Sequence, residues 1–310
     1  MTELSRLAGW GQRKTVVRGV VVFGLTTGIF FLLFGRINLG LVFSTLKGIP
    51  FGYLLAATLL TLSFPIISAL RWQMILRSMG HRERFSRCLV IIVGIWPISA
   101  VSPSKAGDIL KVYSLRQSTD TMTIAGSVIA ERAFDIIALA GFALSGGIFF
   151  HNVYIISVSA AVFLAIIAGI LVIHIDLPFP GKKKFQAKLT QLLDSLRKIG
   201  RNRRLLVPIL LLTILNWFAS IVQTKVLFDG VGADVTLGFT SAAMPVAIFV
   251  GLLPITLAGM GTRDAAIVSL FSGFASSHEA LAVALLYSFF GYWLMSIIGL
   301  PFIKKALEAR

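Results

Sequence analysis

Long apolar stretches with almost no charge recur along this chain and constrain its fold more than any other feature. A helix needs about 20 mainly apolar residues to cross the hydrocarbon core of a bilayer. With 56% apolar and only 14% charged residues over its 310 positions, the chain fits neither a soluble globular protein nor a disordered one. The first apolar stretch follows a basic segment but lacks the Ala-x-Ala-like cleavage site of a signal peptide, so we expect a retained anchor helix. The predicted spans are residues 16–34, 51–76, 122–150, 153–175, 205–228 and 280–303.

The cations are sorted along the chain. Lys and Arg number 29 against 13 Asp and Glu, and most of the cations fall before the first span, after the second, between the fourth and fifth, and at the end of the chain. The positive-inside rule makes all of these segments cytoplasmic, including both termini and the basic N-terminal segment 1–15. The basic loop 181–204 has apolar residues at helical spacing, which predicts an amphipathic helix on the inner leaflet or a loop that only sets topology. The net charge of +16 therefore does not indicate nucleic-acid binding.

Two further apolar segments are short and are interrupted by proline and glycine. Residues 88–120 begin in a cytoplasmic loop and must return there, whereas residues 229–278 begin and end on the opposite side. Both read as apolar run, Pro, hydroxyl residue, Gly, Asp and apolar run, which is typical of broken hairpins in transporters built from inverted repeats. Two short complete spans in each segment would satisfy the same topology. The expected fold class is all-α: a single transmembrane domain over 1–310, polytopic, with about six full spans and two re-entrant or broken hairpins in an inverted-repeat-like arrangement.

Charged residues at membrane depth are candidates for a site, because each costs about 2.5–3.5 kcal/mol on insertion. Glu131, Arg132 and Asp135 lie well inside the span 122–150, and Arg132 is placed to pair with Asp135 one turn later. These three residues either hold helices together as a self-neutralising cluster or line a polar cavity. Arg71 lies near the cytoplasmic end of its span, where its side chain either snorkels to the interface or pairs with Asp108 or Glu131.

The first hairpin carries its own polar residues around a proline and a glycine. Ser104 is placed to cap the helix that follows, and Lys105 and Lys111 are available for an anionic group. Asp108 lies between the two lysines. The alternative is a capped helix start with solvated lysines.

The second hairpin places Thr262, Arg263 and Asp264 at an expected helix start. Backbone N–H groups at a helix N-terminus and an arginine together suit a phosphate. The alternative is that Arg263 and Asp264 cap and dock the helix without a ligand. The single cysteine, the four scattered histidines and the absence of a nucleotide-binding or nucleophile–base motif lead us to expect no metal, no cofactor and no enzyme.

In these motifs the chain resembles the flippase-like integral membrane family that also forms the transmembrane region of lysylphosphatidylglycerol synthases. The resemblance extends over most of the chain, and it is the order and spacing of the motifs together that make it specific. Lys105 and Asp264 depart from the family pattern, in which an arginine or neutral residue and a glutamate are expected, so the head-group contacts stay open. The matching pieces are Arg71-Trp72 with Arg77, residues 103–108 (PSKAGD), Glu131-Arg132 with Asp135, and residues 253–264 (LPITLAGMGTRD).

The resemblance implies translocation of a polar lipid, such as an aminoacylated phospholipid, a glycolipid or a hopanoid. Since the chain ends directly after its last span, we expect the translocating part without an aminoacyltransferase domain. We expect a bacterial-type cytoplasmic membrane protein whose partners are membrane lipids, with a second copy of the chain or a lipid synthase as further candidates. In this hypothesis Lys105, Lys111 and Arg263 contact phosphate, while Asp108, Glu131 and Asp135 contact a cationic head group or carry protons.

Three alternatives remain open at this point. A small-solute or ion transporter could use the same architecture, with a cavity sealed from lipid. A membrane-embedded enzyme could modify a lipid with Asp108 or Glu131 as its base. The chain could also be an accessory subunit of a glycosyltransferase or synthase.

Overall fold

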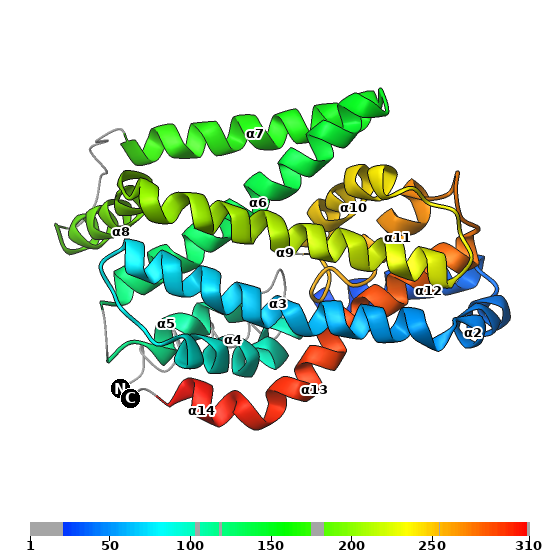
Figure 1. The fold of residues 1–310 in the computed structure, drawn as a ribbon, viewed down its shortest axis with the longest axis horizontal. Coiled ribbons are helices and arrows are strands. Elements are labelled where there is room, and N and C mark those ends of the chain that lie inside the picture. The colour runs from blue at the N-terminus through cyan, green and yellow to red at the C-terminus, as the bar shows by residue number, and fades with distance from the viewer. Residues whose placement is uncertain (1–20, 103–105, 118–119, 175–182, 254, 309–310) are drawn as a thin grey trace, which may run out of the picture.

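The computed structural model is all-α and describes residues 21–102, 106–117, 120–174, 183–253 and 255–308 (Figure 1). Three of its helical segments are long and apolar enough to cross a membrane: α3 (Phe51–Ser78), α9 (Arg203–Gly230) and the continuous segment Ser277–Leu307. The helix Val21–Arg36 and α2 (Leu39–Gly48), which meet at an angle of 88°, make a fourth if they count as one broken span. These findings over the described residues make the chain a polytopic membrane protein.

Two other predicted spans form helices of suitable length. α6 (Thr121–Phe149) has 29 residues and carries Glu131, Arg132 and Asp135 near its middle; it is not among the three segments named above. α7 (Val153–His174) follows it after a short turn and packs along it. The charges of α6 face partners inside the protein, as shown below, which removes the main objection to placing this helix in a membrane.

Hairpin 1 comprises α4 (Phe85–Ala100), the 3-10 turn η1 (Ala106–Ile109) and α5 (Leu110–Ser114). Arg87 in the first turn of α4 donates to the carbonyl of Ser114 at the end of α5, at 3.4 Å. The two limbs therefore begin and end at the same end of the molecule. Gly107 makes the close return possible, because a Cβ there would lie 2.7 Å from the backbone of Ser99.

Hairpin 2 comprises α10 (Leu237–Leu252) and α11 (Thr262–Leu270). The ring of Phe239 near the start of α10 lies 4.3 Å from that of Phe274, just beyond α11. This hairpin also begins and ends at one end of the molecule. Its tip turns sharply through Gly259, which has a φ of 76° and packs against the backbone of Gly251, so that a side chain there would be both strained and obstructed.

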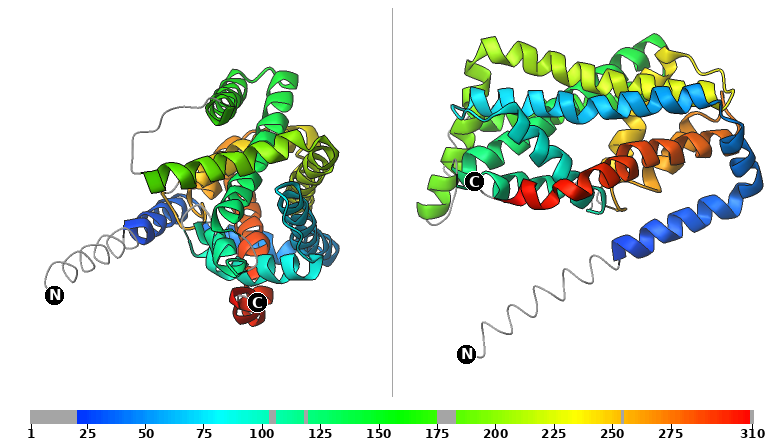
Figure 2. Two further views of the ribbon diagram at one scale, coloured as in Figure 1. Left: turned by 90° about the vertical axis from the view of Figure 1, so that its left-hand side faces the viewer. Right: turned by 60° about the horizontal axis from the view of Figure 1, so that its bottom comes forward.

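The two hairpins enter from opposite ends, and their tips meet. The open end of hairpin 1 lies with α8 and α14, and the open end of hairpin 2 lies near α2 (Figure 1); Figure 2 shows the same two ends from another direction. Ala100 at the tip of hairpin 1 packs in one buried cluster with Ala258 and Met260 of hairpin 2 and with Tyr292. The basic segments that the structure describes gather at the α8 and α14 end, where Arg87 donates to the carbonyl of Lys305 at 2.6 Å.

The loop 181–204 contains α8 (Lys183–Arg201), the helix expected from its spacing; residues 181–182 lie outside the described part. Part of its apolar face packs on protein and not on lipid. Ile199 is 4% exposed and joins a buried cluster with Ile75 and Ile209 of α3 and α9. The side chains of α8 that contact the protein include small Ser195, which lies against Gly126 of α6 and allows the helices to approach closely.

Candidate functional site

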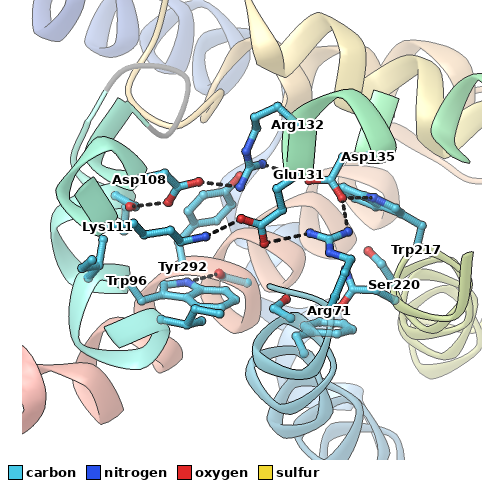
Figure 3. A pocket seen from close by; sticks show the side chains of 18 of the residues that line it. Arg71, Trp96, Asp108, Lys111, Glu131, Arg132, Asp135, Trp217, Ser220 and Tyr292 are labelled. Atoms are coloured by element: carbon cyan, nitrogen blue, oxygen red, sulfur yellow. Dashed lines mark hydrogen bonds and ion pairs between the residues drawn. The ribbon is translucent and has the colours of Figure 1, made fainter. Parts of the chain in front are cut away.

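A polar cavity of about 110 Å³ lies where hairpin 1 faces α3, α6 and α9 (Figure 3). Its fifth wall is the π-helical turn η2 (Phe289–Leu294), inside the last long helical segment. Most charged residues predicted from the sequence for the first hairpin and the spans point into this space. The charged lining residues are Arg71, Asp108, Lys111, Glu131, Arg132 and Asp135.

Glu131 is the centre of a buried ion-pair network. Its Oε1 accepts from Nη2 of Arg71 at 3.1 Å, and its Oε2 accepts from Nζ of Lys111 at 2.5 Å. Arg71 also donates from Nη1 to Oδ1 of Asp135 at 2.5 Å. The side chains of Arg71 and Lys111 are only 3% and 5% exposed. The snorkelling interpretation of Arg71 is therefore wrong, because the carboxylates of α6 hold its guanidinium inside the protein.

Arg132 joins the network to the η1 turn of hairpin 1 and is more accessible than the other two cations. Its Nη1 lies 3.2 Å from Oδ2 of Asp135, which confirms the pair expected from their spacing. Its Nη2 donates to Oδ2 of Asp108 in η1. The other oxygen of Asp108 accepts from the hydroxyl of Ser99, at 2.9 Å. The side chain of Arg132 is 35% exposed.

The network is neutral as a whole, because three cations face three carboxylates. Neutrality and mutual hydrogen bonding are the conditions under which buried charges are tolerated. Lys111, expected to be available for an anionic group, is instead bound to Glu131. Ser104 and Lys105, the other candidates of hairpin 1, lie outside the described residues.

A second, smaller cluster surrounds Arg263 at the tip of hairpin 2. Its Nη1 donates to the hydroxyl of Tyr292 at 2.9 Å and its Nη2 to the hydroxyl of Ser288 at 2.5 Å. The guanidinium carbon lies 4.9 Å from the ring centre of Tyr287 and 5.0 Å from that of Tyr292, which adds cation–π attraction. Arg263 is 2% exposed, so in this conformation it is enclosed by the protein. Its contact with phosphate stays a prediction.

Asp264 and Thr262 shape the start of α11. Asp264 accepts from the backbone N–H of Gly261 at 3.0 Å, which caps the helix, and its other oxygen lies 3.5 Å from Nη2 of Arg263. The hydroxyl of Thr262 lies 3.0 Å from that of Thr256 across the turn. The contacts of Asp264 match the capping and docking role that the sequence left open for Arg263 and Asp264.

A second cavity, of about 290 Å³, continues from the first toward hairpin 2. The two cavities share Arg132, Asp135, Trp217, Tyr287 and Tyr292 as lining residues. The shared wall brings the tips of both hairpins to one polar region, and Arg132 is the cation that faces both spaces.

Several residues of the site carry no charge, and the sequence did not single them out. Trp217 donates from Nε1 to Oδ1 of Asp135 at 2.9 Å, and Ser220 lies 3.0 Å from the hydroxyl of Tyr287. Gln223 donates to the hydroxyl of Thr61 at 2.6 Å. The available signal was the polar series Asn216, Ser220 and Gln223, which interrupts an otherwise apolar span on one helix face.

Metal binding finds no support in the described part of the chain. No group of three or more His, Cys, Asp or Glu side chains is arranged there to hold an ion. The carboxylates of the cavity already bind cations of the protein itself.

Comparison of the chain with known proteins identifies its family. The model of the lysylphosphatidylglycerol synthase TM region matches residues 16–299, nearly the whole chain. The chain belongs to this family. Among its relatives is a UPF0104 membrane protein of Archaeoglobus fulgidus, 26% identical over 77% of this chain and 81% of the relative. UPF0104 membrane proteins of Methanothermobacter thermautotrophicus and Methanocaldococcus jannaschii are 21% and 23% identical, each over 83% of this chain and 87% of the relative.

Proposed function

We propose that this member of the family translocates a lipid, by taking its polar head group through the cavities between the two hairpins while its acyl chains stay in the bilayer. The observation that carries the proposal is the polar, charge-lined space enclosed by helices whose outer surfaces are apolar. A cavity of this kind gives a head group polar partners at a depth where lipid offers none. The proposal includes a cytoplasmic membrane location with both termini on the cytoplasmic side.

The order of the elements supports the proposed function, because it is consistent with an inverted repeat. Each half has a first membrane helix, a helix that we place outside the membrane, a long span, a hairpin and a second long span. The two helices placed outside the membrane, α2 and α8, lie at opposite ends of the molecule, as do the open ends of the hairpins (Figure 1). We propose that all six long helices span the membrane, that both hairpins are re-entrant, and that alternating access comes from movement between the halves. The halves are Val21–Arg36, α2, α3, α4–α5 and α6, and α7, α8, α9, α10–α11 and Ser277–Leu307.

An apolar groove beside the network favours a lipid over a small solute. This space of about 360 Å³ lies between α6, α7 and α9 and is lined by Gly141, Phe142 and Phe163 among others. Thr213 also lines it, and the hydroxyl of Thr213 lies 3.5 Å from Nη1 of Arg71. An acyl chain in the groove would therefore lie one side chain away from the charged network. A transporter of water-soluble substrates has no need of an apolar groove at this point.

The test is reconstitution in liposomes that contain fluorescent phosphatidylglycerol, with transbilayer movement followed by chemical quenching of the outer leaflet. Arg132→Ala should reduce the protein-dependent rate by about tenfold or more, since among the described residues it removes the cation that lines both cavities. Arg197→Ala is the matched control, because Arg197 also pairs with a carboxylate three residues away, at 3.3 Å, but on the outer helix α8.

Equal rates for wild type, Arg132→Ala and empty liposomes would overturn the proposal. Mass spectrometry of the recovered lipid separates transport from chemistry, because a translocator leaves its mass unchanged and an enzyme does not. The same sample tests the proposed absence of enzymatic activity. Purification in mild detergent then shows whether a second copy or a lipid synthase accompanies the chain.

A further inference from the structure

The three cations of the network differ in their accessibility. Arg71 and Lys111 are almost completely enclosed, and both bind Glu131. Arg132 is 35% exposed and lines both cavities. Arg132 is therefore the most accessible of these three cations to a ligand in either cavity.

The guanidinium of Arg132 is only partly satisfied by its carboxylate partners. Nη1 is held by Asp135, and Nη2 binds Asp108. Nε is buried and has no hydrogen-bond partner among the described residues. Nε and Nη2 form one edge of the planar guanidinium, the edge that a phosphate binds with two oxygens. Asp108 uses only half of this edge.

We propose that a phosphate group, carried by the translocated lipid, displaces Asp108 from Arg132 and so releases the η1 tip of hairpin 1 from α6. This inference rests on the proposed function and concerns how the phosphate of the lipid is bound and how its binding is coupled to movement. A phosphate satisfies both Nε and Nη2, whereas Asp108 satisfies one of them. Asp135 keeps its contact with Nη1, so Arg132 stays fixed to its own helix during the exchange.

The exchange couples ligand binding to movement because the Arg132–Asp108 pair joins two different elements. Arg132 belongs to α6, and Asp108 belongs to η1 of hairpin 1. Once displaced, Asp108 keeps its hydrogen bond from Ser99, which lies in the same hairpin. The phosphate and the released carboxylate are then like charges side by side, which favours movement of the η1 tip away from Arg132. Lys111 of α5 stays paired with Glu131, so the rest of hairpin 1 remains attached to α6. The buried cluster that holds Ala100 of hairpin 1 together with Ala258 and Met260 of hairpin 2 is the first packing that this movement loosens.

The first experiment measures binding in detergent, without transport. The probes are short-chain phosphatidylglycerol, diacylglycerol with the same chains, and inorganic phosphate. Asp108→Asn removes the competing charge and should tighten binding of the phosphatidylglycerol by roughly tenfold. Arg132→Lys lacks the two-donor edge and should weaken it by about tenfold. Asp194→Asn, at the exposed pair on α8, is the matched control and should leave binding unchanged.

Unchanged or weaker binding by Asp108→Asn would overturn the exchange. Equal binding of diacylglycerol would show that the phosphate is not recognised, and would overturn it as well. Binding of inorganic phosphate alone, with no gain from the lipid chains, would assign the site to a free anion. The exchange at Arg132 would then hold, and its lipid source would be wrong.

A second measurement does not depend on Asp108. Ala100→Cys and Ala258→Cys, in a Cys88→Ala background, place one thiol on each hairpin tip for a short bifunctional reagent. Phosphatidylglycerol should lower the cross-linking yield relative to diacylglycerol, because only the phosphate releases the tip of hairpin 1 from Arg132. Equal yields would overturn the release of the tip. If the protein transports lipid but Asp108→Asn does not change lipid binding, this inference alone is contradicted. If the phosphate of the lipid displaces Asp108 but the lipid is not transported, the proposed function alone is contradicted.

Discussion

Each hairpin tip carries a charged residue in an apolar region of the protein, and the two charges are stabilised in different ways. Arg263 of hairpin 2 is 2% exposed and is held by hydroxyls, aromatic faces and Asp264. Asp108 of hairpin 1 is held across a cavity by Arg132, whose side chain is 35% exposed. An enclosed cation with many neutral partners fixes its hairpin, whereas an ion pair at a cavity wall can exchange with a ligand.

Between the tips lies the enclosed part of the network, in which Glu131 joins two cations from different elements. The molecule therefore has a rigid centre, one fixed tip and one exchangeable tip. This ranking predicts how much the loss of one carboxylate destabilises the protein at each place. The three substitutions below test it from the largest effect to the smallest.

Glu131→Gln is expected to have the largest effect. It leaves Lys111 buried without its charge partner and takes one of two carboxylates from Arg71, at a cost of about 3–5 kcal/mol in unfolding free energy. Titration with denaturing detergent in mixed micelles measures this loss. Adding Lys111→Met removes the orphaned cation and should restore about half of the loss. A loss no larger than that of Asp108→Asn would contradict the ranking.

Much of this centre was predictable from sequence because its residues lie on one helix. Glu131, Arg132 and Asp135 are close in sequence, so helical spacing alone fixes their shared region and the Arg132–Asp135 pair. The other two cations of the network, Arg71 and Lys111, lie 60 and 20 residues before Glu131 in the sequence. Spacing says nothing about such contacts, and for this reason Arg71 could be given alternatives but no single partner.

The partners of Arg263 were not predictable for a different reason. Serine and tyrosine are ordinary residues in apolar helices, and nothing local distinguishes Ser288 and Tyr292 from packing residues. Their direction depends on the π-helical turn Phe289–Leu294, which changes the angular spacing of the residues along the helix. The hairpins themselves were recognisable, because proline and glycine interrupt short apolar runs in both.

Asp264→Asn is expected to have an intermediate effect. The substitution removes the carboxylate beside Arg263, but the hydroxyls of Tyr292 and Ser288 and two aromatic faces remain. The amide oxygen can still accept from the N–H of Gly261 and keep the cap. The expected loss is about 2 kcal/mol, measured by the same titration. A loss equal to that of Glu131→Gln would mean that neutral partners do not compensate for the missing charge.

Asp108→Asn should have the smallest effect on stability, about 1 kcal/mol or less, because its ion-pair partner is partly exposed and keeps Asp135. The amide still accepts from Ser99, so the turn of hairpin 1 keeps its internal hydrogen bond. Unfolding titrations of this variant and of Asp194→Asn should therefore give similar small losses. A loss as large as that for Asp264→Asn would mean that hairpin 1 is as firmly fixed as hairpin 2. An exchangeable contact should show a small loss of unfolding free energy together with a large change in lipid affinity. The reason is that the ligand replaces the contact, so the contact contributes little to the stability of the fold.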